Sequence, residues 1–296
     1  MPFLSILVPA FNEEAGIEKA MKNLLASPDL VDFELIIVND GSTDQTGAII
    51  NSLQGFDPRV KPIHHRANRG YGSAIRTAAM AAQGQLVAWY DSDGQHQVHD
   101  LISVVNSVKS GNLDYSIGIR GADSHQVANR KIGKWILRRA VEFSANQTVG
   151  DFNSGLRCFR RDVLLRYLHL LPRGFGASTT TTILMLERGY TGAEVPITTL
   201  EREGKSSVKQ VRDGARTLMI ILRLMLLFKP LHFFSIIGIF AIACGLIWNF
   251  ATPDRTGFSV LSALIIGFGV QCSILGLIAD QLSALRRERF EANYNH

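Results

Sequence analysis

Charge is absent from two long stretches of this 296-residue chain, Leu231 to Phe250 and Ser259 to Ala279. Each has about the twenty residues that a helix needs to cross a lipid bilayer. A buried core helix is the alternative for one such stretch, but two in tandem argue against it. We therefore expect a two-helix transmembrane hairpin over 231–281, between a juxtamembrane segment at 201–230 and a basic tail at 282–296.

Three further sequence features are missing, and their absence argues against a cysteine metal or redox site, a dinucleotide site and a signal peptide. The three cysteines lack the spacing of a metal or redox motif, so they are interpreted as small core residues in a reducing compartment. No Gly-x-Gly-x-x-Gly follows the first apolar run, which argues against a dinucleotide site built on a helix N-terminus. Phe3 to Val8 has strand length and no basic region before it, so no signal peptide is expected.

The basic residues that give the chain its net charge of +5 gather beside the apolar stretches. Lys and Arg are frequent from Arg202 to Lys229 and again at Arg286, Arg287 and Arg289, whereas the connector Ala251 to Phe258 has a single arginine. By the positive-inside rule, both ends lie in the cytoplasm and the connector lies outside. Patches of interleaved aromatic and basic residues are absent, so the charge predicts contact with a lipid bilayer and no nucleic acid partner.

The first two hundred residues alternate short apolar runs with helical patterns, which predicts an α/β domain over 1–200 with a mostly parallel, doubly wound sheet. Strands are predicted at Phe3–Val8, Phe33–Val38, Val60–His65, Leu86–Tyr90, Asp114–Ile119 and Ala193–Thr198, and Pro9 is expected to halt the first. Helices are predicted from Phe11–Glu14 to about Ala26, after Asp44 to about Leu53, and over Ser73–Ala82 and Val98–Lys109. The carboxyl ends of parallel strands share one edge of such a sheet, where α/β proteins bind ligands.

Two carboxylates, Asp91 and Asp93, directly follow the predicted strand Leu86–Tyr90. Because side chains alternate along an extended segment, both can face one cleft while Ser92 turns aside. Two hard oxygen ligands suit a Mg²⁺ or Mn²⁺ ion that takes the rest of its shell from phosphates and water. The alternative is an Asp-Ser-Asp-Gly turn whose carboxylates cap the next helix.

Further carboxylates follow the first and second predicted strands. Glu14 and Asp40 would share the edge of the sheet with Asp91 and Asp93. Together they favour a site that neutralises pyrophosphate with a metal and holds base and ribose hydroxyls with carboxylate acceptors. A turn-forming role for Asp40 is the alternative.

Six blocks along the chain carry a resemblance to a known family. They are, in order, Val8-Pro9-Ala10-Phe11-Asn12-Glu13-Glu14, Val38–Asp44, Ala67-Asn68-Arg69-Gly70, Asp91–His96, Asp151–Arg157 and Arg202–Ser207. The first four resemble the ordered blocks of family-2 glycosyltransferases with a GT-A fold. The last two are similar to the polyprenyl-phosphate branch, the enzymes that resemble dolichol-phosphate mannose synthase. The resemblance covers about Ser5 to Ser207 and implies a Rossmann-like GT-A catalytic domain ahead of an interfacial helix and two transmembrane helices.

The resemblance implies a donor site. In that family the first two blocks hold the nucleotide, which assigns Pro9, Glu14 and Asp40 to the base and ribose. Asp91, Asp93 and Gln95 match the metal and diphosphate ligands, with Mg²⁺ or Mn²⁺ as cofactor. For Gln95, capping of the next helix is the alternative.

The resemblance also implies a place for Asp151 beside the acceptor and the donor sugar. A lipid phosphate is already anionic at neutral pH, so this carboxylate is expected to position substrates or stabilise the developing sugar cation rather than act as a base. With Asp91 and Asp93, it completes the expected catalytic set.

Basic residues are expected to bind the acceptor phosphate. Arg120 closes the predicted strand Asp114–Ile119 and matches an arginine of relatives, although Gly-Ile-Arg replaces their common Gly-Ser-Arg. Arg138 lies with Arg130 and Lys134 at a spacing of four, which indicates one basic stripe on a helix. A solvated helix face is the alternative for that stripe.

Arg202 and Lys205 begin the juxtamembrane segment and are expected to hold phosphate oxygens where the cleft meets the membrane. If residues 202–223 are helical, their basic side chains share one face, as is typical of a helix lying in the membrane interface. Ordinary membrane-surface cations are the alternative for Arg202 and Lys205.

These expectations combine into one function. The chain is interpreted as an inverting glycosyltransferase of the bacterial inner membrane that moves one hexose from a nucleotide sugar to polyprenyl phosphate on the cytoplasmic face. UDP-glucose is the first candidate donor and GDP-mannose the second. The rivals are a processive polysaccharide synthase, against which the missing Gln-x-x-Arg-Trp block argues, and a non-catalytic membrane adaptor that binds nucleotide sugar. The sequence is compatible with a homo-oligomer and does not determine the oligomeric state.

Overall fold

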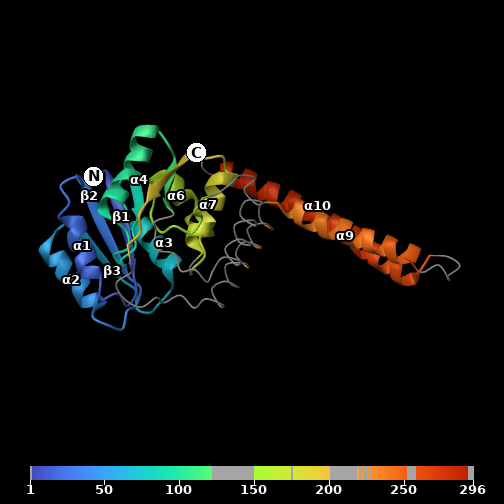
Figure 1. Cartoon of the computed structure of the whole chain (residues 1–296), viewed down its shortest axis with the longest axis horizontal. Coiled ribbons are helices and arrows are strands. Elements are labelled where there is room, and N and C mark those ends of the chain that lie inside the picture. Colours follow the sequence, from blue (N-terminus) through green and yellow to red (C-terminus); the bar gives the residue numbers. More distant parts are fainter. Residues whose placement is uncertain are drawn as a thin grey trace. The chain divides into compact units, whose positions relative to one another are not determined.

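The computed structural model describes residues 2–121, 150–174, 176–200, 229–251 and 258–292, with the single positions Met219, Leu222 and Leu226. The chain divides into two compact units, Met1–Ile220 and Ile221–His296. The first unit is the α/β domain and the second contains the apolar helices (Figure 1).

A seven-stranded sheet in the order β3-β2-β1-β4-β6-β5-β7 forms the centre of the first unit. Its strands are β1 Leu4–Ala10, β2 Phe33–Asn39, β3 Val60–His64, β4 Leu86–Trp89, β5 Tyr115–Arg120, β6 Arg157–Arg160 and β7 Gly192–Ile197. Only β6 runs antiparallel to its neighbours, β4 and β5. The predicted mostly parallel α/β sheet is therefore confirmed.

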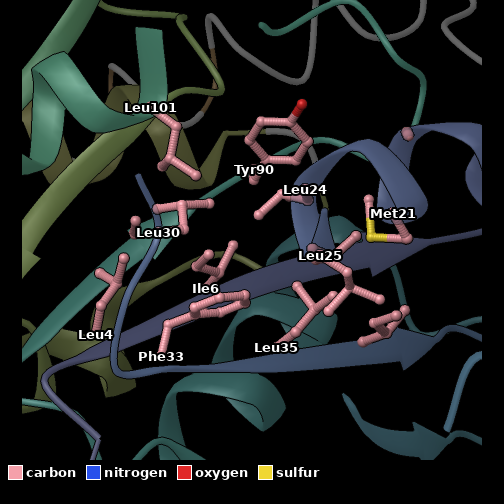
Figure 2. Close-up of a cluster of buried hydrophobic side chains, with 14 of the residues drawn as sticks. Leu4, Ile6, Met21, Leu24, Leu25, Leu30, Phe33, Leu35, Tyr90 and Leu101 are labelled. Atoms are coloured by element: carbon pink, nitrogen blue, oxygen red, sulfur yellow. The ribbon is translucent and has the colours of Figure 1, made fainter. Parts of the chain in front are cut away.

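Helices cover both faces of this sheet. They are α1 Ile17–Leu25, α2 Thr46–Phe56, α3 Tyr71–Ala81, α4 Val98–Gly111, α6 Arg161–Tyr167 and α7 Ala177–Glu187, with a short 3-10 helix, η2, at Leu168–Leu170. One core cluster joins α1, α2 and α4 to a single face of the sheet, and Figure 2 shows Met21 and Leu24 of α1 above Ile6 and Leu35. Every residue of β1 and β2 is buried, which explains why these strands are mostly apolar, with Ser5, Glu34 and Asn39 as the exceptions.

Proline does not halt the first strand, contrary to prediction. β1 continues through Pro9 to Ala10, and Pro9 stays in register with Val38 of β2. Pairing of β1 with β4 ends at Leu7. Because successive residues of a strand point to alternate sides, the N–H that Pro9 lacks falls on the β4 side, where the ladder no longer needs it.

The first helix begins at Ile17, so the prediction that it starts within Phe11–Glu14 was wrong. Asn12 has a φ of 55°, in the left-handed region that ends regular structure. The backbone N–H groups of Asn12, Glu13 and Glu14 donate to side chains of Ser42, Thr46 and Asp44. The segment 11–16 is therefore a turn that packs on the loop between β2 and α2. The remaining predicted boundaries differ from the structure by a few residues, while β6, α6 and α7 had no predicted counterpart.

Two long apolar helices make up the described part of the second unit, α9 Pro230–Ala251 and α10 Val260–Ala292. Both are long and apolar enough to cross a membrane, with mean hydropathy of 2.2 and 2.1 over their candidate spans. They pack closely at Gly238 and Gly269, where a Cβ on either glycine would lie within 2.7 Å of the other's carbonyl oxygen. α10 continues to Ala292, past the boundary at 281 expected for the hairpin.

Candidate functional site

The two carboxylates after β4 have different surroundings. The Asp91 side chain is 28% exposed, whereas Asp93 is buried and accepts a hydrogen bond from the Gln95 N–H at 3.2 Å. Ser92 between them is buried, and its hydroxyl donates to the Pro9 carbonyl at 3.1 Å. Ser92 thus turns aside as predicted and ties the end of β1 to the start of the acidic loop.

Residues from two distant segments, together with His96 of the same loop, surround the carboxylate of Asp91. The Tyr71 hydroxyl, at the start of α3, donates to Asp91 Oδ1 at 3.0 Å. His96 Nε2 lies 3.6 Å from Oδ2, and a Cβ at Gly155 would come within 2.0 Å of that same oxygen. Only glycine at position 155 leaves room for Asp91 in this place.

An ion pair joins the end of β5 to the loop that leads into β6. Arg120 donates from Nε to Asp151 Oδ2 at 2.5 Å and from Nη2 to Asp151 Oδ1 at 3.1 Å. This two-point geometry is the strongest that arginine makes with a carboxylate. The side chains are 32% and 20% exposed, so the pair lies at the domain surface. Because β6 runs antiparallel between β4 and β5, its start lies at the same sheet edge as Asp91 and Arg120.

The ion pair sets the charge of Asp151. Burial raises the pKa of this carboxyl, but the hydrogen bonds and charge of Arg120 outweigh burial and hold the pKa below its ordinary value. Asp151 is therefore ionised at neutral pH and is a weak base. Arg120 has five N–H donors, so the contact with Asp151 leaves donors for another anion.

Asp40 is buried and already well supplied with hydrogen bonds. Its carboxylate accepts from the N–H groups of Arg69 at 3.0 Å and Gly70 at 2.7 Å, and lies 2.6 Å from His65 Nδ1. Gly70 has a φ of 94°, and a Cβ there would meet the Arg173 carbonyl oxygen at 2.6 Å. Asp40 thus holds the loop before α3, which passes close to the backbone of residues 172–174 as expected for a glycine turn.

The other residues predicted to bind the nucleotide lie near the same edge. Glu14 is exposed, and its carboxylate accepts from the Gln45 N–H at the start of α2 at 2.9 Å. Pro9 is a buried member of β1. Both are within or beside the turn at 11–16.

Gln95 does not cap the following helix, whose N-cap is Gln97. Its side-chain amide Nε2 lies 3.2 Å from the Leu200 carbonyl oxygen, and the Leu200 N–H donates to the Gln95 carbonyl at 2.9 Å. The acidic loop is thereby joined to the chain that follows β7. With Nε2 on Leu200, the amide oxygen is the atom left for a metal.

Arg157 is a buried cation that the motifs did not single out. Its side chain is inaccessible to solvent and donates to the carbonyls of Ser154 and Ser178 and to the hydroxyl of Thr181. Its guanidinium also lies 5.4 Å from the centre of the Trp89 ring. Burial lowers the pKa of Arg157 to about 10, which leaves it charged at neutral pH. Arg157 therefore connects the loop that carries Asp151 to α7 and β4, which explains the structural role of the arginine that ends the Asn-Ser-Gly-Leu-Arg block.

The donor set fits a hard divalent cation. Asp91 and Asp93 supply carboxylate oxygens, and the absence of a side chain at Gly155 gives Asp91 the space that it occupies. Among the described residues, no three His, Cys, Asp or Glu side chains cluster closely enough to hold a metal by themselves. A Mg²⁺ or Mn²⁺ ion here would need substrate oxygens and water to complete its shell, as Mg²⁺ commonly does.

Arg138, with Arg130 and Lys134, falls outside the described residues, as do Arg202 and Lys205. The predicted interfacial helix over 202–223 lies there too, apart from the single positions Met219 and Leu222. The structure therefore brings together Asp91, Asp93, Asp151 and Arg120 at one edge of the sheet, with Asp40, Glu14 and Pro9 along the same side.

Known proteins similar to this chain include glycosyltransferases and an undecaprenyl-phosphate sugar transferase by name. It is 27% identical to glycosyltransferase AglJ of Haloferax volcanii, over 97% of this chain and 95% of that protein. It is 26% identical to the undecaprenyl-phosphate 4-deoxy-4-formamido-L-arabinose transferase of Shewanella sediminis, over 96% of this chain and 88% of that protein.

A solved structure supports the fold. Glucosyl-3-phosphoglycerate synthase of Mycobacterium tuberculosis, in complex with Mn²⁺, UDP-glucose and phosphoglyceric acid, matches with a TM-score of 0.61 and 20% identity. The match covers 75% of this chain and 79% of that one. At this identity the likeness concerns the fold, which is the GT-A arrangement that the resemblance implied.

Two family patterns account for both units of the chain. The GtrB C-terminal hairpin matches residues 229–285, the region of α9 and α10. The pattern described as glycosyl transferase family 2 matches residues 5–168, more than half of the chain and all of the edge that holds Asp91, Arg120 and Asp151. The chain therefore belongs to glycosyl transferase family 2.

Proposed function

We propose that this protein transfers a single hexose from a nucleotide sugar to polyprenyl phosphate, with inversion at the anomeric carbon. One observation carries the proposal: in a family-2 glycosyltransferase followed by an apolar hairpin, the carboxylates after β4 share an edge with the Arg120–Asp151 pair. The first feature suits a diphosphate with its cation, and the second suits an anionic acceptor. UDP-glucose is the first candidate donor and GDP-mannose the second.

The donor lies along the edge formed by β1, β2 and β4 in this proposal. Pro9, Glu14 and the loop that Asp40 holds would contact the base and ribose. Asp91, Asp93 and the Gln95 amide oxygen would hold Mg²⁺ or Mn²⁺ beside the diphosphate. When bound, the cation neutralises the charge that develops on the departing diphosphate. Asp91, Asp93 and Gln95 would hold the cation next to the diphosphate, where that charge develops.

The acceptor needs little help from a base. A phosphate monoester has a second pKa of about 6, so its oxygen is an anionic nucleophile at neutral pH. Asp151, held ionised by Arg120, suits the stabilisation of positive charge at the sugar carbon during displacement. In-line attack of the phosphate oxygen on that carbon breaks its bond to the diphosphate and inverts its configuration.

Positive charge near the membrane would place the acceptor. Arg120 has donors beyond those that contact Asp151, and Arg138, Arg202 and Lys205 are proposed to add cations on the side facing the lipid. The chain of the polyprenyl group is proposed to lie beside α9 and α10, whose surfaces are apolar. We place the domain on the cytoplasmic face of a bacterial inner membrane because the basic segments flank the hairpin.

A donor panel tests the proposal. The full chain in detergent is mixed with a short polyprenyl phosphate, Mn²⁺ and each of several nucleotide sugars, and the lipid product is identified by mass. The expected product is the acceptor plus one hexose, and an Asp91→Asn variant should give none. A polymer would identify a processive synthase instead, and nucleotide-sugar binding without any product would favour the membrane adaptor.

Orientation is tested by labelling single added cysteines in intact cells. A label at Thr256 should report the outer side, whereas labels at Ser42 and Asn293 should report the cytoplasm. If the label at Asn293 reports the outer side, the proposed pairing of the two spans is wrong.

A further inference from the structure

We propose that Tyr71 is a positioning residue, whose hydroxyl holds the carboxylate of Asp91 in the orientation in which it binds the cation. The proposal rests on the proposed function for the reaction that the cation serves. It adds a residue that the family motifs do not assign, since position 71 falls directly after the Ala67-Asn68-Arg69-Gly70 block.

The contact itself is well defined. Tyr71 is the first residue of α3, and its hydroxyl donates to Asp91 Oδ1 at 3.0 Å. A hydrogen bond to an ionised carboxylate is stronger than one between neutral groups, so this contact restricts the rotation of Asp91.

The surroundings of Oδ2 also restrict the Asp91 carboxylate. Gly155 lies against Oδ2, and a Cβ there would approach it to 2.0 Å. His96 Nε2 is 3.6 Å from the same oxygen. The carboxylate is therefore held at Oδ1 by the hydroxyl of Tyr71 and packed at Oδ2 against Gly155, which together fix its orientation.

The position of Tyr71 is set by the loop before it. The Arg69 and Gly70 N–H groups both donate to Asp40, which is buried at the end of β2. On the other side, the Ser73 N–H donates to the Arg173 carbonyl at 3.0 Å. Three consecutive residues, 69 to 71, thus connect the carboxylate on the nucleotide side with the carboxylate on the metal side. Such outer contacts orient metal ligands, and their loss costs about 10- to 100-fold in metal affinity.

The alternative is that Tyr71 only fills space in the interior. Phenylalanine separates the two explanations, because Tyr71→Phe keeps the ring and removes the hydroxyl. A matched control is Tyr167→Phe in α6, which removes a hydroxyl that lies 3.2 Å from the hydroxyl of Tyr190, and neither tyrosine is a predicted site residue.

The test measures cation binding apart from turnover. Wild type, Tyr71→Phe and Tyr167→Phe, each as the full chain in detergent, are titrated with Mn²⁺ alone and with UDP or GDP, and free Mn²⁺ is followed by electron paramagnetic resonance. Tyr71→Phe should bind Mn²⁺ about tenfold more weakly than wild type, near the lower limit for outer contacts. Tyr167→Phe should match wild type. In the transfer assay, raising Mn²⁺ should restore most of the turnover of Tyr71→Phe.

Two results would overturn the proposal: equal Mn²⁺ affinity of Tyr71→Phe and wild type, or no Mn²⁺ binding by wild type under any of these conditions. A loss of turnover in Tyr71→Phe that excess Mn²⁺ does not relieve also contradicts it. If the expected difference in Mn²⁺ affinity is seen but no donor yields a lipid product, the proposed function fails while the positioning role stands.

Discussion

Asp40 and Asp91 both follow a buried parallel strand, yet their carboxylates are bound in different ways. Asp40 is 4% exposed and accepts from two backbone N–H groups of one loop. Asp91 is 28% exposed and accepts from a side chain, the Tyr71 hydroxyl. Backbone donors are fixed by the fold, whereas an exposed oxygen is available to a ligand. The comparison therefore separates carboxylates that build the site from carboxylates that face the substrate.

The largest expected effect is that of Asp93→Asn, which removes the second carboxylate of the acidic loop that also carries Asp91. The variant should fold normally and lose transfer by roughly 100-fold or more, because charge is removed where the diphosphate leaves. Initial rates and a thermal unfolding scan in detergent measure the two quantities. Asp162→Asn, an exposed position in α6 whose carboxylate pairs with Arg160, is the control and should retain most activity. Substantial transfer by Asp93→Asn, or full activity of wild type in excess chelator, would exclude the metal role.

Asp151→Asn should have the next largest effect, a loss of turnover of up to about 100-fold through misplacement of the reacting groups. Its pKa lies below the ordinary range because Arg120 outweighs the effect of burial, so Asp151 stays ionised between pH 5 and 9. The fall of activity with acid should instead follow the acceptor phosphate near about pH 6.

The pH profile distinguishes a positioner from a base at Asp151. Wild type and Asp151→Asn should lose activity toward acid with the same apparent pKa, measured as kcat/KM for the lipid acceptor. If the acid limb disappears in the variant, Asp151 is the base of the reaction and the interpretation as a positioner is wrong.

Asp40→Asn tests the role of Asp40 as a carboxylate that holds the loop before α3. An amide keeps one acceptor oxygen but loses the charge that serves two N–H groups, so the free energy of unfolding should fall by about 1–3 kcal/mol. The KM for the donor should rise more than kcat falls, since the loop at 69–71 shifts. Denaturant unfolding and donor kinetics measure both. An unchanged stability with a raised KM would instead indicate direct contact between Asp40 and the nucleotide.

The sequence alone predicted the fold class, the candidate spans and the strands that carry Asp40, Asp91 and Arg120. These features depend on local patterns, such as the continuous apolar runs of strands buried on both faces. The antiparallel β6 was not predicted because its four residues, Arg157 to Arg160, contain two arginines. A polar strand this short has no periodicity to detect, and the contacts that bury Arg157 come from α7.

Contacts between segments that are distant in the chain could not be predicted from the sequence either. The motifs assigned Arg120 to the acceptor and Asp151 to the sugar, whereas the structure joins the two in an ion pair. Tyr71 was given no role because its partner, Asp91, lies twenty residues away. The start of the first helix was misplaced for a related reason: the N–H groups of residues 12–14 find their acceptors in the loop after β2.

The smallest effect is expected at Glu34, a building carboxylate at the opposite end of β2 from Asp40. Its side chain is 3% exposed, and its carboxylate accepts from Ser5, Lys61 and the Gln83 N–H. Burial raises the pKa of Glu34, but these hydrogen bonds outweigh burial and leave the pKa below 4.5. A carboxyl with a lowered pKa contributes stability above its unfolded pKa, and that stability is lost as the pH falls through the folded value.

Glu34→Gln should therefore lower the free energy of unfolding by about 1 kcal/mol at pH 7, because the amide still accepts one set of hydrogen bonds but no longer pairs with Lys61. The difference from wild type should shrink below about pH 4, as wild-type Glu34 becomes protonated. Transfer kinetics should be unchanged, since Glu34 lies at the end of the sheet away from Asp91. Urea unfolding from pH 3 to 8 measures the stability, and a difference that persists undiminished at pH 3 would contradict the role of the ionised carboxylate. A loss of transfer without a loss of stability would show that Glu34 serves the reaction and not the stability of the fold.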